Sequence, residues 1–201
     1  MDGEGNLAIV AREENPANYT CHYGTCTHTS ARCVTQGKVE FTYGRVEARL
    51  KLPYGQGIWP AFWMLGANFD EVGWPQSGEI DIMENVGFDP LRIHAAVHTD
   101  AYNHVRGNHR SGTTEASPPP WEAFHVYSME WTPDRIDVFL DGERYFSFAN
   151  EGTGTAAWPF DQPHFFIANL AIGGTWGGQQ GIDDSLFPHV MLVDYVRVYQ
   201  R

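Results

Sequence analysis

Three carboxylates fall within one short segment, Gly78 to Asn85, that has the alternation of a β-strand. In a strand, successive side chains point to opposite faces, so Glu79 and Asp81 share one face while the isoleucines between and after them point the other way. Strict alternation places Glu84 with those isoleucines. A β-bulge near Met83 turns Glu84 back toward the other two acids, and such bulges re-aim side chains at active sites.

Three acids on one face predict acid and base chemistry. Crowding raises the pKa of at least one carboxyl group and leaves another group ionised. This is the division between proton donor and nucleophile in glycoside hydrolysis. The alternative is that the acids form the solvated face of an amphipathic strand. Acids are poor strand formers and adjacent like charges repel, which disfavours that alternative.

Alternation of apolar and polar residues recurs along the chain, while helical periodicity is almost absent. The 201 residues suit one domain spanning residues 1–201, and the 21 glycines and 12 prolines separate many short segments. The pattern predicts an all-β protein, a two-sheet sandwich or a barrel. Strands are expected at residues 7–11, 38–43, 45–52, 59–65, 93–99, 125–131, 135–140, 143–148, 165–172 and 191–199.

Turn signals separate these strands. Asp141 and Gly142 form a tight hairpin signal between two of them. The polar stretches 103–120 and 173–188 are expected to be loops, and loops at the rim of a sheet can wall a groove.

The composition favours a neutral partner. The net charge is -12, with 13 basic and 25 acidic residues, which disfavours nucleic acid and anionic membrane surfaces. No apolar run approaches the ~18 residues of a membrane-spanning helix. The printed sequence also shows no signal-peptide pattern at its start. The 7 tryptophans, 9 tyrosines and 12 phenylalanines suit a carbohydrate groove, because sugar C–H faces stack on aromatic rings.

The three cysteines lie close together in the sequence. We expect a disulfide between Cys21 and Cys26, which leaves Cys33 as a small buried residue or a free thiol. The alternative is a metal site formed by both of the first two cysteines with His22 and His28. That spacing is unlike the usual zinc pattern of two separated cysteine pairs.

Two tryptophans lie just before the acidic segment. Trp59 and Trp63 are four residues apart, hence on one strand face, where their rings can flank a sugar chain. Burial of both rings in the core is the alternative.

The chain resembles glycoside hydrolase family 16 over nearly its whole length from Gly5 onward, and within the family it is most similar to the laminarinase, or endo-β-1,3-glucanase, branch. The acidic motif has the form E-x-D-x-x-E, whereas the lichenase and xyloglucan branch generally has E-x-D-x-E. The additional residue lies at the position of Met83. The resemblance rests on residues 57–66, 74–75, 78–85, 169–174 and 191–199.

The resemblance implies a concanavalin-like β-jelly roll of two curved antiparallel sheets, with the acids on the concave face. It implies retention of anomeric configuration, with Glu79 as nucleophile, Glu84 as general acid and then base, and Asp81 as the carboxylate that orients Glu79. Retaining enzymes hold two carboxyl groups ~5–5.5 Å apart, which two long side chains on a bulged strand can reach. Catalysis of this kind is expected to need no cofactor.

The resemblance also assigns substrate-binding positions. Trp176 matches a loop tryptophan of the cleft, Asn169 a polar residue facing the groove, Arg32 a residue that bonds sugar hydroxyls, and His98 a histidine near the acid/base residue. For each, a satisfied buried polar group or a surface charge is the alternative. His94 shares a strand face with His98, but without a third ligand the pair does not predict zinc.

A structural calcium ion is a further expectation. Asp194 resembles a position that, with backbone oxygens near Gly5, binds calcium in many relatives, and calcium takes ~6–8 oxygen ligands. Relatives usually carry several dozen residues before the segment that matches residues 6–10. We therefore expect a sandwich that closes differently or has an exposed edge, and a monomer unless that edge pairs with another strand.

The sequence thus predicts a secreted, extracellular, retaining endo-β-1,3-glucanase acting on laminarin-like β-glucan. A jelly-roll module that binds β-glucan with weak or no catalysis is one alternative. A hydrolase of the same family acting on mixed-linkage β-1,3-1,4-glucan or on a galactan is the other. The intact set of three acids favours an enzyme, because a binding module has no need of closely spaced carboxylates.

Overall fold

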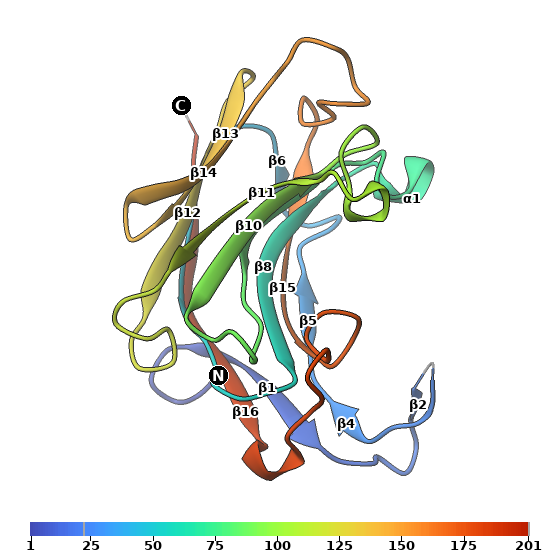
Figure 1. Cartoon of the computed structure of the whole chain (residues 1–201), viewed down its shortest axis with the longest axis vertical. Helices are drawn as coiled ribbons and strands as arrows, with labels where there is room; N and C mark the ends of the chain where they lie inside the picture. Colours follow the sequence, from blue (N-terminus) through green and yellow to red (C-terminus); the bar gives the residue numbers. More distant parts are fainter. Residues whose placement is uncertain (22, 201) are drawn as a thin grey trace.

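The computed structural model, which describes residues 1–21 and 23–200, consists mainly of two antiparallel sheets packed on each other (Figure 1). In spatial order, the first sheet contains β14 (Glu143–Ala149), β13 (Arg135–Leu140), β12 (His125–Trp131), β7 (Gly44–Lys51), β16 (His189–Tyr199), β1 (Leu7–Glu13) and β4 (His28–Thr29). The second contains β11 (Arg110–Glu115), β10 (Arg92–His98), β9 (Glu79–Glu84), β8 (Ile58–Gly66), β15 (His164–Ile172) and β5 (Arg32–Val34), with β6 (Glu40–Phe41) also paired to β15.

The remaining elements are short. The hairpin of β2 (Thr20–Cys21) and β3 (Gly24–Thr25) projects beyond β4 (Figure 1). Among the described residues, one α-helix, α1 (Phe69–Val72), and the 3-10 helices η1 (His104–Arg106) and η2 (Asp184–Leu186) lie in loops. None of the helices among the described residues is long and apolar enough to cross a membrane.

The core lies between the two sheets and follows from the alternation of the strands. In β7, Val46, Ala48 and Leu50 are fully buried, and the charged residues between them are not. From the second sheet, β9 contributes Ile80 and Ile82 to the same apolar cluster. Each fully buried large aliphatic side chain contributes about 1.5–3 kcal/mol to folding. Burial of one face of β9 leaves its other face, with the acids, pointing away from the core.

Most expected strands are present. The strands at 125–131 and 135–140 match their expected bounds, and all of the others except 38–43 end within about two residues of them. The predicted hairpin at Asp141 and Gly142 is confirmed, since both residues have left-handed φ angles of 49° and 89°.

Two expectations about regular structure are wrong. The strand expected at 38–43 is reduced to Glu40–Phe41, because the chain turns at Gly37, with φ of 69°, and Thr35 O accepts hydrogen bonds from the next turn. The stretch 103–120 is not only a loop, since β11 lies within it and pairs with β10. β11 is an edge strand whose residues are polar and largely exposed. Because it lacks alternating apolar residues, its sequence gives no strand pattern.

The cysteine prediction is confirmed in its main part. Cys21 and Cys26 form a disulfide, so neither thiolate is free for zinc, and the alternative metal site is wrong. His22, its third proposed ligand, lies outside the described residues. The imidazole of His28 bonds to Asp184 instead. Cys33 is a free thiol and is exposed, not buried.

Candidate active site

The acidic strand β9 contains the bulge expected near Met83. On β8, the consecutive residues Phe62 and Trp63 pair with Met83 and Asp81, so Ile82 has no partner there. The register of β9 against β10 shifts at the same place. Two residues of β9 therefore occupy the space of one, which reverses the alternation beyond the bulge.

The bulge brings the three acids together. Ile82 and Met83 are both fully buried, whereas Glu79, Asp81 and Glu84 line one pocket of about 190 Å³ on the opposite face. The bulge also has support from β14, since the hydroxyl of Tyr145 donates to Ile82 O at 3.0 Å. That bond satisfies a carbonyl at the site of the irregularity, where the strand ladder is disrupted.

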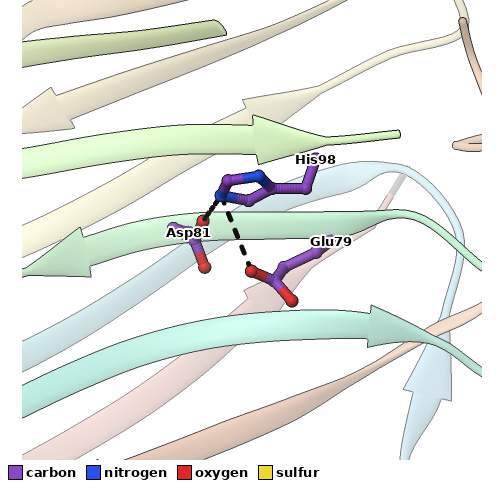
Figure 2. Close-up of side chains that lie close together, drawn as sticks. All are labelled: Glu79, Asp81 and His98. Carbon is purple, nitrogen blue, oxygen red and sulfur yellow. Dashed lines mark ion pairs between the residues drawn. The ribbon is translucent and has the colours of Figure 1, made fainter. Parts of the chain in front are cut away.

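His98, from β10, lies beside the two acids at the start of β9. Its Nε2 is 3.3 Å from Asp81 Oδ2 and 3.7 Å from Glu79 Oε1 (Figure 2). Figure 2 shows the imidazole pointing between the two carboxylates. The imidazole is largely buried, and its Nδ1 has no hydrogen-bond partner among the described residues. The Nε2 atom of His98 therefore faces both carboxylates.

Burial is the largest cause of the pKa shifts of Glu79 and Asp81. It raises the pKa of Asp81 to about 8, although a hydrogen bond with Glu79 opposes the rise. The pKa of Glu79 is also well above its ordinary value, first because of burial and then because of the Asp81 charge. His98 and a hydrogen bond from Trp74 favour the ionised form of Glu79. One proton shared by the pair avoids two buried negative charges side by side, so the two carboxyl groups titrate as a unit.

Glu84 is held in its protonated form at neutral pH. Burial, and secondarily the charge of Asp81, raise the pKa of Glu84 to about 8. The indole Nε1 of Trp59 donates to Glu84 Oε1 at 3.0 Å, which partly opposes that rise because it stabilises the carboxylate. Glu84 therefore combines a proton at pH 7 with a fixed orientation, as a general acid requires.

Aromatic and polar side chains wall the pocket. Trp59 and Trp63, each half-buried, both line it, together with Asn169. The indole of Trp63 donates to Asn169 Oδ1 at 2.7 Å, and the guanidinium of Arg32 lies over the Trp63 ring at 4.9 Å. Trp176, also half-buried, packs edge-on against Trp59, with ring centroids 5.3 Å apart. Trp59, Trp63 and Asn169 thus line the pocket of the acids, whereas Arg32 and Trp176 contact its tryptophans; the roles of all five stay predictions.

The sequence interpretation did not assign roles to several neighbours of the acids. Trp74 bonds to Glu79 and lies against His104, with ring centroids 4.9 Å apart. His104 and His109 both pack on His98, at 5.1 and 5.3 Å between centroids. The only sequence feature that pointed to any of these residues is Trp74-Pro75, one of the segments on which the family resemblance rests. His104 lies in η1, and His109 lies just before the edge strand β11, in a stretch that carries no local pattern.

Two groups bear on metal binding. One ligand atom from each of Glu79, Asp81 and His98 lies within 4.8 Å of the others, a set of residue types that suits a divalent cation. The calcium position expected at Asp194 and Gly5 is less suitable, because the Asp194 carboxylate is bound by Arg49 Nη1 at 2.6 Å. Calcium at Asp194 and Gly5 therefore stays a prediction from the resemblance.

A two-sheet β-sandwich whose bulged strand presents three acids in an indole-walled pocket has the features of a retaining glycoside hydrolase. A profile of glycosyl hydrolases family 16 matches residues 5–196, and the chain belongs to this family. The chain is 49% identical to the "Beta-glucanase" of Rhodothermus marinus, covering 98% of this chain and 69% of the relative. Family members of this kind need no catalytic cofactor.

Solved structures agree with the fold. The laminarinase from Rhodothermus marinus is 48% identical and superposes with a TM-score of 0.91, covering 98% of this chain and 78% of that one. A mutant of a non-specific endo-β-1,3(4)-glucanase of the same family superposes with a TM-score of 0.93 at 46% identity, covering 98% of this chain and 76% of that one. That protein was co-crystallised with 1,3-β-D-cellotriosyl-glucose and presents 1,3-β-D-cellobiosyl-glucose at its active site. The jelly-roll fold expected from the sequence is thereby confirmed.

Proposed function

We propose that this chain is a retaining endo-β-1,3(4)-glucanase that cleaves laminarin-like β-glucans by double displacement. The observation that carries the proposal is the bulge at Ile82 and Met83, which brings Glu84 into one pocket with Glu79 and Asp81. The relatives' activity and the glucan bound by one of them support the substrate class. The neutral, aromatic walls of the pocket suit a sugar chain.

In the first displacement, the carboxylate of Glu79 attacks the anomeric carbon. The glycosidic C–O bond breaks as Glu84 gives its proton to the leaving oxygen, so a glycosyl ester forms on Glu79. In the second, ionised Glu84 takes a proton from water, the water oxygen attacks the same carbon, and Glu79 leaves as a carboxylate. Asp81 holds the proton that it shares with Glu79 and thereby stabilises the leaving carboxylate.

A reducing-sugar assay on laminarin, mixed-linkage β-glucan and agarose tests the function. New reducing ends are expected on laminarin, with slower or comparable release on mixed-linkage glucan and none on agarose. Proton NMR of the earliest products is expected to show the β-anomer before mutarotation, because two inversions retain the configuration. Folded protein that binds glucan without releasing reducing ends would be a binding module, and release of the α-anomer first would exclude the retaining mechanism.

The hydrogen bond from Trp59 to Glu84 leads to a prediction about pH. Activity requires protonated Glu84, so it should fall as pH rises through the pKa of about 8. Trp59→Phe removes a donor to the carboxylate, which favours the neutral acid and shifts the alkaline limb of kcat/KM upward by about 0.5–1 pH unit. The normalised pH profile measures the shift. Trp63→Phe is the matched control, since its indole donates to Asn169 and not to an acid; an equal shift in both variants would refute the assignment.

We also propose that the protein acts outside the cell. The Cys21–Cys26 disulfide persists in oxidising compartments, and a polysaccharide substrate is itself extracellular. Fractionation of a producing culture tests this: laminarin hydrolysis in the medium is expected, and activity confined to the cell lysate would contradict it.

A further inference from the structure

A second β-bulge lies in the first sheet, on β14. Val138 and Phe139 are consecutive residues of β13. Their partners on β14 are Phe146 and Arg144, so the pairing skips Tyr145. Strict alternation would point the Tyr145 side chain away from the core, opposite to that of its buried neighbour Phe146. The bulge turns Tyr145 inward instead, and its side chain packs against the core cluster.

One hydrogen bond joins this bulge to the bulge of the acidic strand. Tyr145 Oη donates to Ile82 O at 3.0 Å, and Ile82 is the residue that the pairing of β9 with β8 skips. The extra residue of each bulge therefore contacts the extra residue of the other, and the bond links the two sheets. A carbonyl that a bulge displaces from the strand ladder needs another donor inside the core, and the phenol supplies it.

Small residues leave room for this contact. β11 and β10 come before β9 in the second sheet, and β11 lies against β14. A Cβ atom on Gly112 of β11 would lie 2.6 Å from Tyr145 O, so a larger residue there would force β11 and β14 apart. Gly112 pairs with Ala95 of β10, which lies at the register shift of β10 against β9 and adds one buried methyl group. The Tyr145 ring can therefore reach β9.

We propose that Tyr145 is a positioning residue for the proton donor: its hydroxyl fixes Ile82 O, and thereby the direction in which the Glu84 side chain leaves the strand. Glu84 comes after the bulge, whereas Glu79 and Asp81 come before it. Loss of the hydroxyl should therefore displace the acid that protonates the leaving oxygen and spare the nucleophile. The inference rests on the proposed function and deepens it, because it assigns the orientation of one catalytic group to a side chain of the other sheet.

Tyr145→Phe tests the proposal by removing one oxygen atom. The kcat for laminarin is expected to fall about 5- to 30-fold, because a displaced general acid retains only part of its usual contribution. KM should change by less than about twofold, since the walls of the pocket are unaltered. With an aryl β-glucoside of an acidic phenol, the rate of the first burst of phenolate should stay within about twofold, because that step needs Glu79 but no proton. Steady-state and rapid-mixing kinetics measure these rates.

Tyr127→Phe is the matched control. Tyr127, on β12, is a fully buried tyrosine whose hydroxyl has no hydrogen-bond partner among the described residues. Its loss of one oxygen atom should leave both activities unchanged. A fall of the laminarin kcat in this control equal to that in Tyr145→Phe would overturn the proposal. So would unchanged laminarin activity in Tyr145→Phe, or a burst rate that falls as much as the laminarin kcat, since a general structural defect would slow both displacements.

Hydrogen exchange separates failure of this proposal from failure of the proposed function. In Tyr145→Phe, the amides of Ile82, Met83 and Glu84 should exchange several times faster, while those of β7 stay protected. If the unaltered protein cleaves no glucan, the proposed function fails, but this selective rise still supports the link between Tyr145 and the acidic strand. If the unaltered protein is active and the exchange of these amides is the same in both proteins, the link is excluded and the function stands.

The unaltered protein offers a further test that needs no substitution. A Tyr145 hydroxyl proton that is bonded to Ile82 O should exchange slowly with solvent, which NMR of protein labelled at its tyrosines measures. Rapid exchange of that proton would overturn the proposal.

Discussion

Replacing Glu79 with glutamine is expected to lower kcat on laminarin by about 10⁴-fold or more, because an amide cannot form the glycosyl ester and the loss of a nucleophile removes the whole covalent route. KM should change much less, since the shape and polarity of the pocket are nearly preserved. Steady-state kinetics with a reducing-sugar readout measure both parameters. Glu115→Gln, on the exposed edge strand β11, is the matched control and should keep full activity.

The companion variant Glu79→Ala tests the role of Glu79 through the configuration of the product. Removal of the side chain leaves space where azide can attack the anomeric carbon in place of the carboxylate, provided that the substrate carries an activated leaving group. A single inversion then gives the α-glycosyl azide, which NMR distinguishes from the β-form. Formation of the β-azide, or Glu79→Gln activity equal to that of the control, would show that Glu79 is not the nucleophile.

The sequence predicts the fold well because the strands are amphipathic. In β7, charged and apolar residues alternate, and burial follows that alternation residue by residue. The bulge was also predictable, since three acids in the E-x-D-x-x-E spacing share a face only if one extra residue is absorbed. Its position, with Ile82 unpaired and Met83 next to it, is one residue from the position named by the sequence argument.

Contacts between distant segments were not predictable from local pattern. β11 has the composition of a polar loop and becomes a strand only because it can pair with β10. The hydroxyl of Tyr145 reaches Ile82 O across 63 positions in the sequence, and nothing in β14 indicates that role. The same holds for Trp74, whose bond to Glu79 depends on how the loop before β9 folds back. Side chains that tune the acids thus come from tertiary packing, whereas the acids themselves come from one strand.

Replacing Glu84 with alanine is expected to produce a loss that depends on the leaving group. For laminarin, whose leaving hydroxyl needs a proton, kcat should fall about 10²- to 10⁴-fold, the usual contribution of a general acid. For an aryl β-glucoside with an acidic phenol, the first displacement should be nearly unaffected, because the phenolate leaves without protonation. The glycosyl ester then accumulates, and rapid-mixing kinetics should show a burst of phenolate followed by slow turnover.

Azide also distinguishes the role of Glu84 from that of Glu79. In Glu84→Ala, Glu79 still forms the glycosyl ester, and azide, which needs no general base, attacks that ester to give the β-glycosyl azide by two inversions. Turnover of the aryl substrate should therefore rise with azide concentration, and the alkaline limb set by the Glu84 pKa of about 8 should disappear from the pH profile. A variant without burst, azide rescue or loss of that limb would assign the proton to another group, and Asp81, whose pKa is also raised to about 8, is the acid that the geometry offers in its place.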